Sequence, residues 1–387
     1  MTAPRILLYV QNLLGIGHLR RAAAVARALD AAGMEVSFVT GGMPVPHLPV
    51  GGSEWVQLPP VRTRDNDFKV LVDEADRPID DGFRNSRRDA LLKVFRDVRP
   101  DAVITELFPF GRRQMRFELI PLLEAANAAR PRPVVLSSMR DILVTKPRAD
   151  RNQEIVDTFS VFYDHALIHA DPELITLDRT FPMVEGIRDR LIYTGYVVNM
   201  PEVSVPDADP RETGEVLISA GGGAVGAEMV TRLVEMMPDL PLGDRTWRLI
   251  TGHHMPGAAV SKLGAFDRPN LIIERSRSDL PALMAQAALS ISQAGYNTLL
   301  ELMAVRARSV VVPFEGGVET EQRLRADLLA GLGALEMVPE DHLDVPTLSA
   351  AMRAAYDRPR DRVPPVDLEG AAKTAGIVRR LIDGRSA

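Results

Sequence analysis

The stretch VLISAGGGAVGAEMVTRLVEMM, residues 216–237, joins an apolar run to a glycine turn and then to apolar residues at helical spacing. This order predicts a buried strand that enters a helix through a tight loop. The amino-terminal segment repeats it, with the apolar run RILLYV at 5–10, a glycine turn, and a helical pattern over 18–32. Each half of the chain therefore begins with the same strand, turn and helix.

Further apolar runs follow each of these starts and alternate with helical patterns. They predict strands at 35–40, 102–105, 133–137, 166–169, 191–194, 247–251, 271–274, 289–292 and 309–312. Such alternation indicates parallel sheets with helices on both faces. The predicted fold class is α/β, with two Rossmann-like domains. We expect these domains to face each other across a cleft, because such sheets bind ligands at the carboxyl ends of their strands.

The length of the chain and one proline-rich segment divide it into domains. Its 387 residues exceed the roughly 250 to 300 that one hydrophobic core usually serves. The segment PEVSVPDADP, residues 201–210, carries prolines among acidic residues and is typical of a linker. We predict an N-terminal domain at 1–200, a C-terminal domain at 211–365, and a helix in the last segment, 366–387.

The composition excludes several classes of function. Lys and Arg number 46 against 52 Asp and Glu, so the net charge of −6 gives no attraction to nucleic acid. The absence of cysteine excludes disulfides, Cys-ligated metals and thiol nucleophiles. No uninterrupted run reaches the roughly 18 apolar residues of a membrane span, and the amino terminus lacks the apolar core of a signal peptide. We expect a cytoplasmic protein.

The glycine turn of the second half is the strongest phosphate-binding signal. Gly221, Gly222, Gly223 and Gly226 let the backbone approach an anion in front of a helix amino terminus. Three of these glycines also have dinucleotide-binding spacing, but the next strand ends in TGHH and offers no acidic residue for a ribose. No Lys followed by Ser or Thr closes the turn, which excludes a Walker loop. A turn that serves packing alone is the alternative.

The corresponding turn of the first half contains a candidate general base. Gly17 and His18 open the first predicted helix, so His18 follows the first strand of its sheet. The helix amino terminus, Arg20 and Arg21 disfavour a protonated imidazole, and a neutral ring can accept a proton. A histidine that only caps or packs is the alternative.

Polar residues also follow two other predicted strands. Glu106, after the strand at 102–105, is a second candidate catalytic residue, and Arg112 and Arg113 are candidates for contact with an anionic acceptor. Arg140 and Asp141 follow the strand at 133–137. The alternatives are a solvated helix start for the first group and a local ion pair for the second.

The segment ERSRSDLPALMAQAALSISQAGYNTLLELMAVRARSVVVPFEGGVETEQ, residues 274–322, resembles the donor-binding half of glycosyltransferase family 28. That family includes the enzyme that adds N-acetylglucosamine to lipid-linked muramyl peptide. The shared pattern is a strand ending at Ser292, then Gly295 and Thr298, the helical Glu301, a strand ending in VPF, and the pair Glu321 and Gln322.

The resemblance implies the glycosyltransferase B fold and a role for several residues. In relatives the helical Glu, here Glu301, holds the ribose hydroxyls of UDP, and the Gln of the EQ pair, here Gln322, contacts the donor sugar. The glycines at 221–223 approach the diphosphate, and the loop from Arg275 to Leu280 borders the base. The C-terminal helix at 366–387 packs back on the N-terminal domain.

The segment GIGHLRRAAAVARAL, residues 15–29, resembles a second relative, the UDP-sugar hydrolase of pseudaminic acid synthesis. Its corresponding His serves the attack by water. Together the resemblances imply a metal-independent inverting transferase that moves a sugar from a UDP-sugar to a hydroxyl acceptor, lipid-linked or glycan, with peripheral contact at the inner face of the membrane. A UDP-sugar hydrolase and a non-catalytic nucleotide-sugar sensor are the alternatives.

The sequence also contains two weak motifs for a metal site, DxD pairs and a pair of adjacent histidines. Asp65 with Asp67, and Asp207 with Asp209, have the DxD spacing of metal-dependent transferases, but one pair lies in a polar stretch and the other in the linker. The adjacent His253 and His254 have no carboxylate partner in the sequence pattern. We expect neither a bound metal nor a cofactor.

Overall fold

The computed structural model describes residues 2–13, 15–45, 48–64, 70–143, 149–199, 203–204, 206, 209–221, 226–252, 255–266, 268–316, 320–360 and 366–386. The chain divides into two compact units. The first consists of Met1–Asn199 with Asp367–Ala387, and the second of Met200–Val366.

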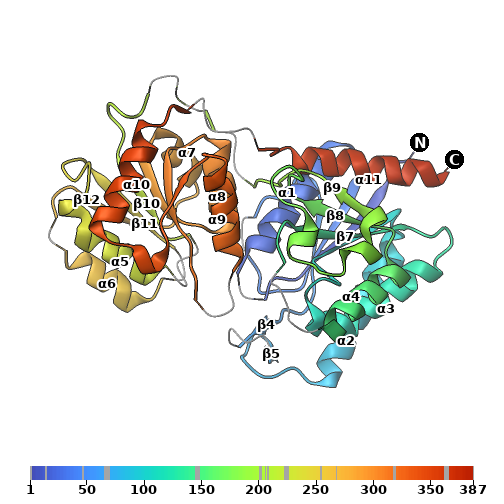
Figure 1. Cartoon of the computed structure of the whole chain (residues 1–387). Helices are drawn as coiled ribbons and strands as arrows, with labels where there is room; N and C mark the ends of the chain where they lie inside the picture. Colours follow the sequence, from blue (N-terminus) through green and yellow to red (C-terminus); the bar gives the residue numbers. More distant parts are fainter. Residues whose placement is uncertain are drawn as a thin grey trace. The chain divides into compact units, whose positions relative to one another are not determined.

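The first unit is a parallel sheet in the order β3-β2-β1-β6-β7-β8-β9, with helices on both faces (Figure 1). Its strands are β1 (Arg5–Val10), β2 (Glu35–Thr40), β3 (Glu54–Gln57), β6 (Ala102–Glu106), β7 (Val134–Arg140), β8 (His165–His169) and β9 (Leu191–Tyr193). Its helices are α1 (Gly17–Ala31), α2 (Asp81–Val98), α3 (Arg116–Ala128), α4 (Ala149–Phe162) and α11 (Gly370–Ser386). A small antiparallel pair, β4 (Arg62–Thr63) and β5 (Leu71–Val72), lies outside this sheet.

The second unit is a parallel sheet in the order β12-β11-β10-β13-β14-β15. Its strands are β10 (Val216–Ser219), β11 (Trp247–Thr251), β12 (Leu271–Arg275), β13 (Leu289–Gln293), β14 (Ser309–Val312) and β15 (Glu336–Met337). Its helices are α5 (Ala227–Met236), α6 (Gly257–Gly264), α7 (Leu280–Gln286), α8 (Tyr296–Ala304), α9 (Glu321–Gly331) and α10 (Val345–Asp357). Both sheets have the doubly wound pattern that the sequence predicts.

The buried strands were the easiest elements to predict. The bounds of β1, β2, β11 and β14 are those expected from the sequence, since each is a short apolar run that is buried along most of its length. Helix α2 was not predicted because eight of its 18 residues are charged, and its described buried residues are only Arg87, Leu91 and Phe95. Its start is nevertheless capped by Asp80, whose side chain accepts a hydrogen bond from the amide of Phe83.

Helix α11, at the end of the chain, packs against α1 of the first unit. Ala375, Ile377 and Val378 belong to the same buried apolar cluster as residues of α1 and β1. Just before the helix, the amide of Tyr196 donates to the carbonyl of Asp367, which joins this segment to the end of the sheet.

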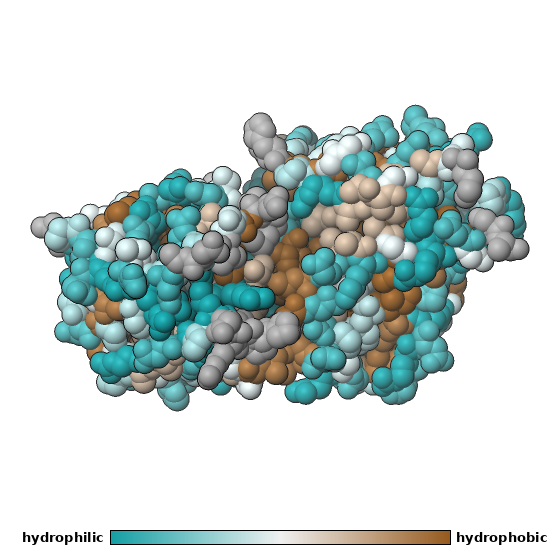
Figure 2. Space-filling model, turned by 90° about the horizontal axis from the view of Figure 1, so that it is seen from above, coloured by the Kyte–Doolittle hydropathy of each residue, from teal (hydrophilic) through white to brown (hydrophobic). Residues whose placement is uncertain are grey.

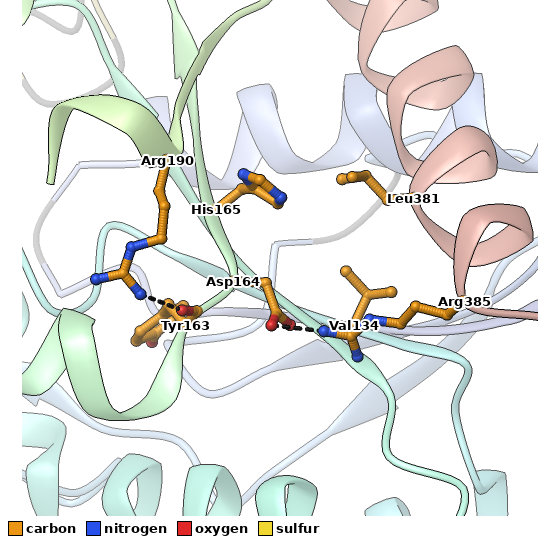
Figure 3. A pocket seen from close by; sticks show the side chains of 7 residues that line it. All are labelled: Val134, Tyr163, Asp164, His165, Arg190, Leu381 and Arg385. Atoms are coloured by element: carbon orange, nitrogen blue, oxygen red, sulfur yellow. Dashed lines mark hydrogen bonds and ion pairs between the residues drawn. The ribbon is translucent and has the colours of Figure 1, made fainter.

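A cavity of about 320 Å³ lies where α11 meets the amino-terminal ends of β7 and β8 (Figure 3). It is lined by Val134, Tyr163, Asp164, His165, Arg190, Leu381 and Arg385. Asp164 forms ion pairs with Arg132 at 3.0 Å and with Arg385 at 2.5 Å. These contacts fasten the last turn of α11 to this edge of the sheet, opposite the edge where the strands end.

A buried ion pair supports the loops at the carboxyl edge of the first sheet. Arg87 and Glu118 are both fully buried, and two hydrogen bonds of 2.7 Å join the guanidinium to the carboxylate. Arg87 also donates to the carbonyl of Gly41 at 2.8 Å, to Gln11 Oε1 at 3.0 Å and to the carbonyl of Pro59. One side chain therefore connects the loops that follow β1, β2 and β3.

We predict that Arg87→Met lowers the unfolding free energy of the first unit by about 3 to 5 kcal/mol, because it leaves the charge of Glu118 buried without its partner. The matched control is Arg84→Met on the same helix, whose Arg84 pairs with Asp81 at the surface. The control should stay within about 1 kcal/mol of the wild type.

Urea unfolding followed by ¹⁹F NMR of fluorotryptophan-labelled protein measures the two units separately. The chain has two tryptophans, Trp55 in the first unit and Trp247 in the second. Only the Trp55 transition should shift in Arg87→Met. Equal shifts in both variants, or a shift of the Trp247 transition alone, would contradict the role given to Arg87.

Candidate functional site

The strand order brings His18 and Glu106 to one position in the first sheet. The chain winds outward from β1 to β2 and β3, then returns to β6 on the other side of β1. At such a reversal the loops after the two central strands diverge, and ligands of doubly wound sheets bind there. His18 is the second residue of α1, directly after the β1 loop, and Glu106 is the last residue of β6.

These two side chains contact each other, and Arg21 contacts both. His18 Nδ1 lies 2.9 Å from Glu106 Oε1, and Arg21 Nη2 lies 3.0 Å from His18 Nδ1 and also donates to Glu106 Oε1. The side chains of Arg21 and Glu106 are 2% and 1% exposed, whereas that of His18 is 15% exposed. A ligand can therefore reach His18 but not the charges behind it.

Burial and charge keep the imidazole of His18 neutral. Burial, reinforced by the positive charges of Arg112 and Arg21, lowers the pKa of His18 to about 3, although Glu106 acts in the opposite direction. Burial by itself raises the pKa of Glu106, but Arg21 and the hydrogen bonds from His18 and Ser138 hold that pKa well below its usual range. The site thus combines a neutral imidazole with an ionised carboxylate.

The carboxylate decides which nitrogen of His18 carries the proton. An ionised carboxylate accepts hydrogen bonds, so Nδ1–H donates to Glu106 and leaves Nε2 unprotonated. Among the described residues, no hydrogen bond joins Nε2 to another side chain or to the backbone. Nε2 is therefore available to take a proton from a ligand.

Three further polar side chains lie behind Glu106, and the sequence pattern did not single them out. Ser138 Oγ is 2.7 Å from Glu106 Oε2 and 2.9 Å from His169 Nε2, and His169 Nδ1 is 2.8 Å from Thr194 Oγ1. All three are buried: Ser138 lies two residues before the end of β7, His169 is the last residue of β8, and Thr194 directly follows β9. The signal that could have found them is a polar residue closing each of several consecutive apolar strands.

The remaining residues expected at this edge have structural partners. Arg112 donates from Nε to the carbonyl of Gln11 at 2.8 Å, and burial lowers its pKa to about 10. Arg113 is exposed and pairs with Glu154. Asp141 is 1% exposed and accepts hydrogen bonds from the amide of Ile142 and the hydroxyl of Tyr196. Gly17 is the first residue of α1, and as a glycine it places no side chain at this position of the helix.

In the second unit the corresponding reversal lies between β10 and β13. Gly221 follows β10 with φ +57°, in the left-handed region that favours glycine. A Cβ built on Gly221 would lie 3.8 Å from Thr298 Oγ1 and 3.9 Å from Gln293 Oε1, and one on Gly295 would also lie 3.8 Å from Thr298 Oγ1. The structure thus brings together Gly221, Gly295 and Thr298. Gly222 and Gly223 lie outside the described residues.

Two helices begin at this edge without side-chain caps. Gly295 precedes α8 and Gly226 precedes α5, so the residue before each helix has no side chain that could cap it. The first amides of each helix therefore have no partner within the helix, and the helix dipole adds positive potential. This arrangement can bind a phosphate.

The predicted donor-binding residues of α8 and α9 lie beside these helix starts. Glu301, on α8 one turn beyond Thr298, is 8% exposed, and Glu321, the first residue of α9, is 3% exposed. Gln322 accepts a hydrogen bond on Oε1 from the amide of Phe314 at 3.0 Å, which leaves its amide N–H groups as its donors. Arg325 of α9 lies over the ring of Tyr296, 5.1 Å from its centre, and joins α9 to the start of α8.

Three other residues expected to bind the donor lie on β12, α7 and β13. Arg275 is exposed at the end of β12, two strands from β10, and Leu280 begins α7. Ser292 is fully buried within β13, where its Oγ lies 3.2 Å from the hydroxyls of both Ser219 and Ser290. The roles of all these residues stay predictions.

The described part of the chain contains no group of three or more His, Cys, Asp and Glu side chains that could hold a metal ion. Asp209 is instead bound by Arg211 and Arg308, at 2.8 Å and 2.9 Å. The other candidate ligands, Asp65, Asp67, Asp207, His253 and His254, lie outside the described residues.

Hydrophobic side chains are also exposed at the surface of the described part of the chain. The face seen in Figure 2 is a mosaic of hydrophilic and hydrophobic residues. Among the described residues, the exposed large hydrophobic ones, Val70, Val161, Ile272 and Leu332, are dispersed over both units. None of the described helices has the length and apolar run that crossing a membrane requires.

Known proteins are similar in sequence to the second half of the chain and similar in fold to the whole chain. Residues 217–373 match the glycosyltransferase family 28 C-terminal domain. A UDP-N-acetylglucosamine–N-acetylmuramyl-(pentapeptide) pyrophosphoryl-undecaprenol N-acetylglucosamine transferase from Synechococcus sp. (strain CC9311) is 31% identical over 170 residues, which are 42% of this chain and 45% of that protein. The enzyme of the same name from Methylorubrum extorquens (strain PA1) is 28% identical over 216 residues, 51% and 56% of the two chains. The chain thus spans about half the length of these curated relatives.

Solved glycosyltransferases superimpose on nearly the whole chain. The calicheamicin glycosyltransferase CalG4 aligns with a TM-score of 0.63 and 14% identity, over 99% of this chain and 98% of its own. MurG of Acinetobacter baumannii aligns with a TM-score of 0.61 and 16% identity, over 97% and 100%. The resemblance and the fold expected from the sequence are thereby confirmed: residues 217–373 match the glycosyltransferase family 28 C-terminal domain, and the chain has the two parallel α/β sheets of the glycosyltransferase B fold.

Proposed function

We propose that this protein is an inverting, metal-independent glycosyltransferase that moves a hexosyl group from a UDP-sugar to a hydroxyl acceptor. The observation that carries the proposal is the pairing of His18 with Glu106 at the reversal of the first sheet. Direct displacement of the diphosphate by a hydroxyl needs a base for the hydroxyl proton, and the His18 side chain, which is 15% exposed and neutral, can supply that base.

His18 and Glu106 have distinct roles in the proposed step. The acceptor oxygen attacks the anomeric carbon, its proton passes to His18 Nε2, and the bond from the anomeric carbon to the diphosphate breaks. The imidazole becomes an imidazolium as this happens. Glu106 stabilises that positive charge through its contact with Nδ1–H, as the carboxylate of a triad does.

The second unit would hold the donor. Glu301 is the proposed ligand of the ribose hydroxyls, which can donate to both carboxylate oxygens. The uncapped starts of α5 and α8, together with Gly221, would bind the diphosphate and stabilise the negative charge that develops on it. Gln322 would present its amide N–H groups to the sugar.

The names of the curated relatives suggest a class of acceptor. The curated relatives are named for a pyrophosphoryl-undecaprenol acceptor. We propose a lipid-linked or glycan acceptor of the cell envelope, used at the inner face of the membrane by a peripherally bound cytoplasmic protein. Sedimentation with anionic lipid vesicles tests the membrane contact, and recovery of all the protein in the supernatant would contradict it.

We predict that His18→Ala lowers turnover by about 10²- to 10⁴-fold, because general-base catalysis is lost. Its affinity for UDP should stay within a factor of about three of the wild type, since the second unit would hold the nucleotide. The assay is UDP release from the UDP-sugar that gives the largest thermal shift, with and without an acceptor-containing membrane extract. The matched control is His165→Ala, at the opposite edge of the same sheet, which should keep wild-type turnover.

The same assay separates the alternatives. Rapid UDP release in water alone would identify a hydrolase, and tight binding with no release under either condition a sensor. Full turnover by His18→Ala would contradict the assignment of the base.

We predict that Glu301→Ala weakens UDP binding by about 1.5 to 3 kcal/mol, or about 10- to 150-fold, because hydrogen bonds to a charged group are lost. Calorimetry with UDP measures the affinity, and the variant's melting temperature shows whether it is folded. The control is Glu235→Ala, a solvent-facing carboxylate on α5 of the same unit. Unchanged affinity in a folded Glu301→Ala protein would remove Glu301 from the site.

We predict that turnover does not fall with a midpoint near pH 6.5 on the acid side. The active form of His18 is the neutral one, and its pKa of about 3 keeps the ring neutral across the range from about pH 5 to 8. Arg112→Gln removes a positive charge that lowers this pKa, so its acid limb should move to higher pH. Initial rates measured from about pH 3 to 8 test both statements, and a wild-type limb near pH 6.5 would contradict them.

A further inference from the structure

A continuous line of buried hydrogen bonds runs from the candidate base across the first sheet. It passes from His18 to Glu106, Ser138, His169 and Thr194, with distances of 2.9, 2.7, 2.9 and 2.8 Å. Glu106, Ser138, His169 and Thr194 are at most 3% exposed. Burying polar groups costs free energy unless each group has a hydrogen-bond partner. Each residue of this line therefore restricts the orientation of its neighbours.

The ionised carboxylate sets the direction of the hydrogen bonds that Ser138 forms with Glu106 and with His169. Glu106 only accepts, so the single hydroxyl proton of Ser138 points to Glu106 Oε2. Ser138 Oγ must then accept from His169, which places the proton of the neutral His169 ring on Nε2. His169 Nδ1 then faces Thr194 Oγ1 as an acceptor, and the single hydroxyl proton of Thr194 also lies within reach of the carbonyl oxygens of Gly195 at 2.8 Å and Ile168 at 3.3 Å. The donors of Ser138 and His169 therefore point toward Glu106.

Arg21 and Glu106 compete for a hydrogen bond with His18 Nδ1. Its Nη2 lies 3.0 Å from His18 Nδ1, and a guanidinium only donates. If Nδ1 accepted from Arg21, the proton of His18 would sit on Nε2, where it would block the uptake of another proton. If Nδ1–H donates to Glu106, Nε2 is unprotonated. The position of the Glu106 carboxylate selects between these two tautomers.

We infer that Ser138 and His169 are positioning residues, which orient Glu106 so that His18 is held in the tautomer with an unprotonated Nε2. This inference deepens the proposed function and rests on it for its catalytic meaning. Ser138 fixes one carboxylate oxygen, so that the other faces His18, and His169 fixes Ser138. Neither residue needs to contact a substrate, because both act through Glu106.

The most direct test is ¹⁵N NMR of histidine-labelled protein, which reports which ring nitrogen of His18 carries the proton. The signal is assigned by its loss in His18→Asn. Wild-type His18 should be neutral with the proton on Nδ1. Ser138→Ala and His169→Leu should each raise the share of His18 protonated on Nε2 and lower turnover about 10-fold, with UDP affinity unchanged.

Two variants serve as matched controls. Ser137→Ala removes a buried hydroxyl of the neighbouring residue in β7, which donates to the carbonyl of Phe108 at 2.8 Å and not to Glu106. His169→Gln keeps an N–H donor that can reach Ser138. Both should retain the wild-type tautomer of His18, and His169→Gln should recover turnover relative to His169→Leu.

The inference is overturned if wild-type His18 carries its proton on Nε2, or if neither Ser138→Ala nor His169→Leu changes the tautomer. Either folded variant suffices for the comparison, so loss of fold in one leaves the test standing. The NMR readout does not depend on turnover. A wild-type tautomer that responds to Ser138→Ala, together with full turnover by His18→Ala, would refute the proposed function but not the role of the line in holding His18.

Discussion

The ionised carboxylate of Glu106 is the constraint on which the first unit's candidate site depends. A charge that is 1% exposed must be compensated inside the protein, and here Arg21, His18 and Ser138 do so. Two of these partners lie on the first turns of α1, so the compensation also sets how α1 meets the sheet. The need to neutralise one buried carboxylate therefore orients the residue proposed as the base.

The same strand arrangement organises both units but supplies different chemistry at each reversal. Between β1 and β6 the end of the sheet presents ionisable side chains backed by buried hydrogen bonds. Between β10 and β13 it presents glycines and uncapped helix starts, which are suited to phosphate oxygens. We therefore assign proton transfer to the first unit and nucleotide binding to the second.

The sequence predicted what is local and missed what depends on the order of strands. Apolar runs gave the bounds of β1, β2, β11 and β14, and the place of His18 after the first strand singled it out. Glu106 was only a separate candidate, because it lies 88 positions after His18 in the sequence and their contact requires β6 to return beside β1. The contacts that join Ser138 and His169 to Glu106 could not be predicted for the same reason.

The cause of His18 neutrality also needed the structure. Sequence reasoning attributed it to the helix start with Arg20 and Arg21, whereas burial is the largest cause and Arg112, from a distant loop, is the next. Arg87 was missed because a charged residue in a charged helix gives no sign of burial. In the second unit, motif resemblance selected Glu301 and Gln322, and the structure adds that Thr298 lies near both Gly221 and Gly295.

The proposed mechanism requires a nucleotide to bind at the β10 and β13 reversal while the base belongs to the first sheet. A crystal structure of the protein with UDP would show where the nucleotide binds. We predict that the diphosphate lies against Gly221 and the start of α8, with the ribose hydroxyls on Glu301. A nucleotide bound at the glycine turn before α1, or one that makes no contact with α8, would contradict this mechanism.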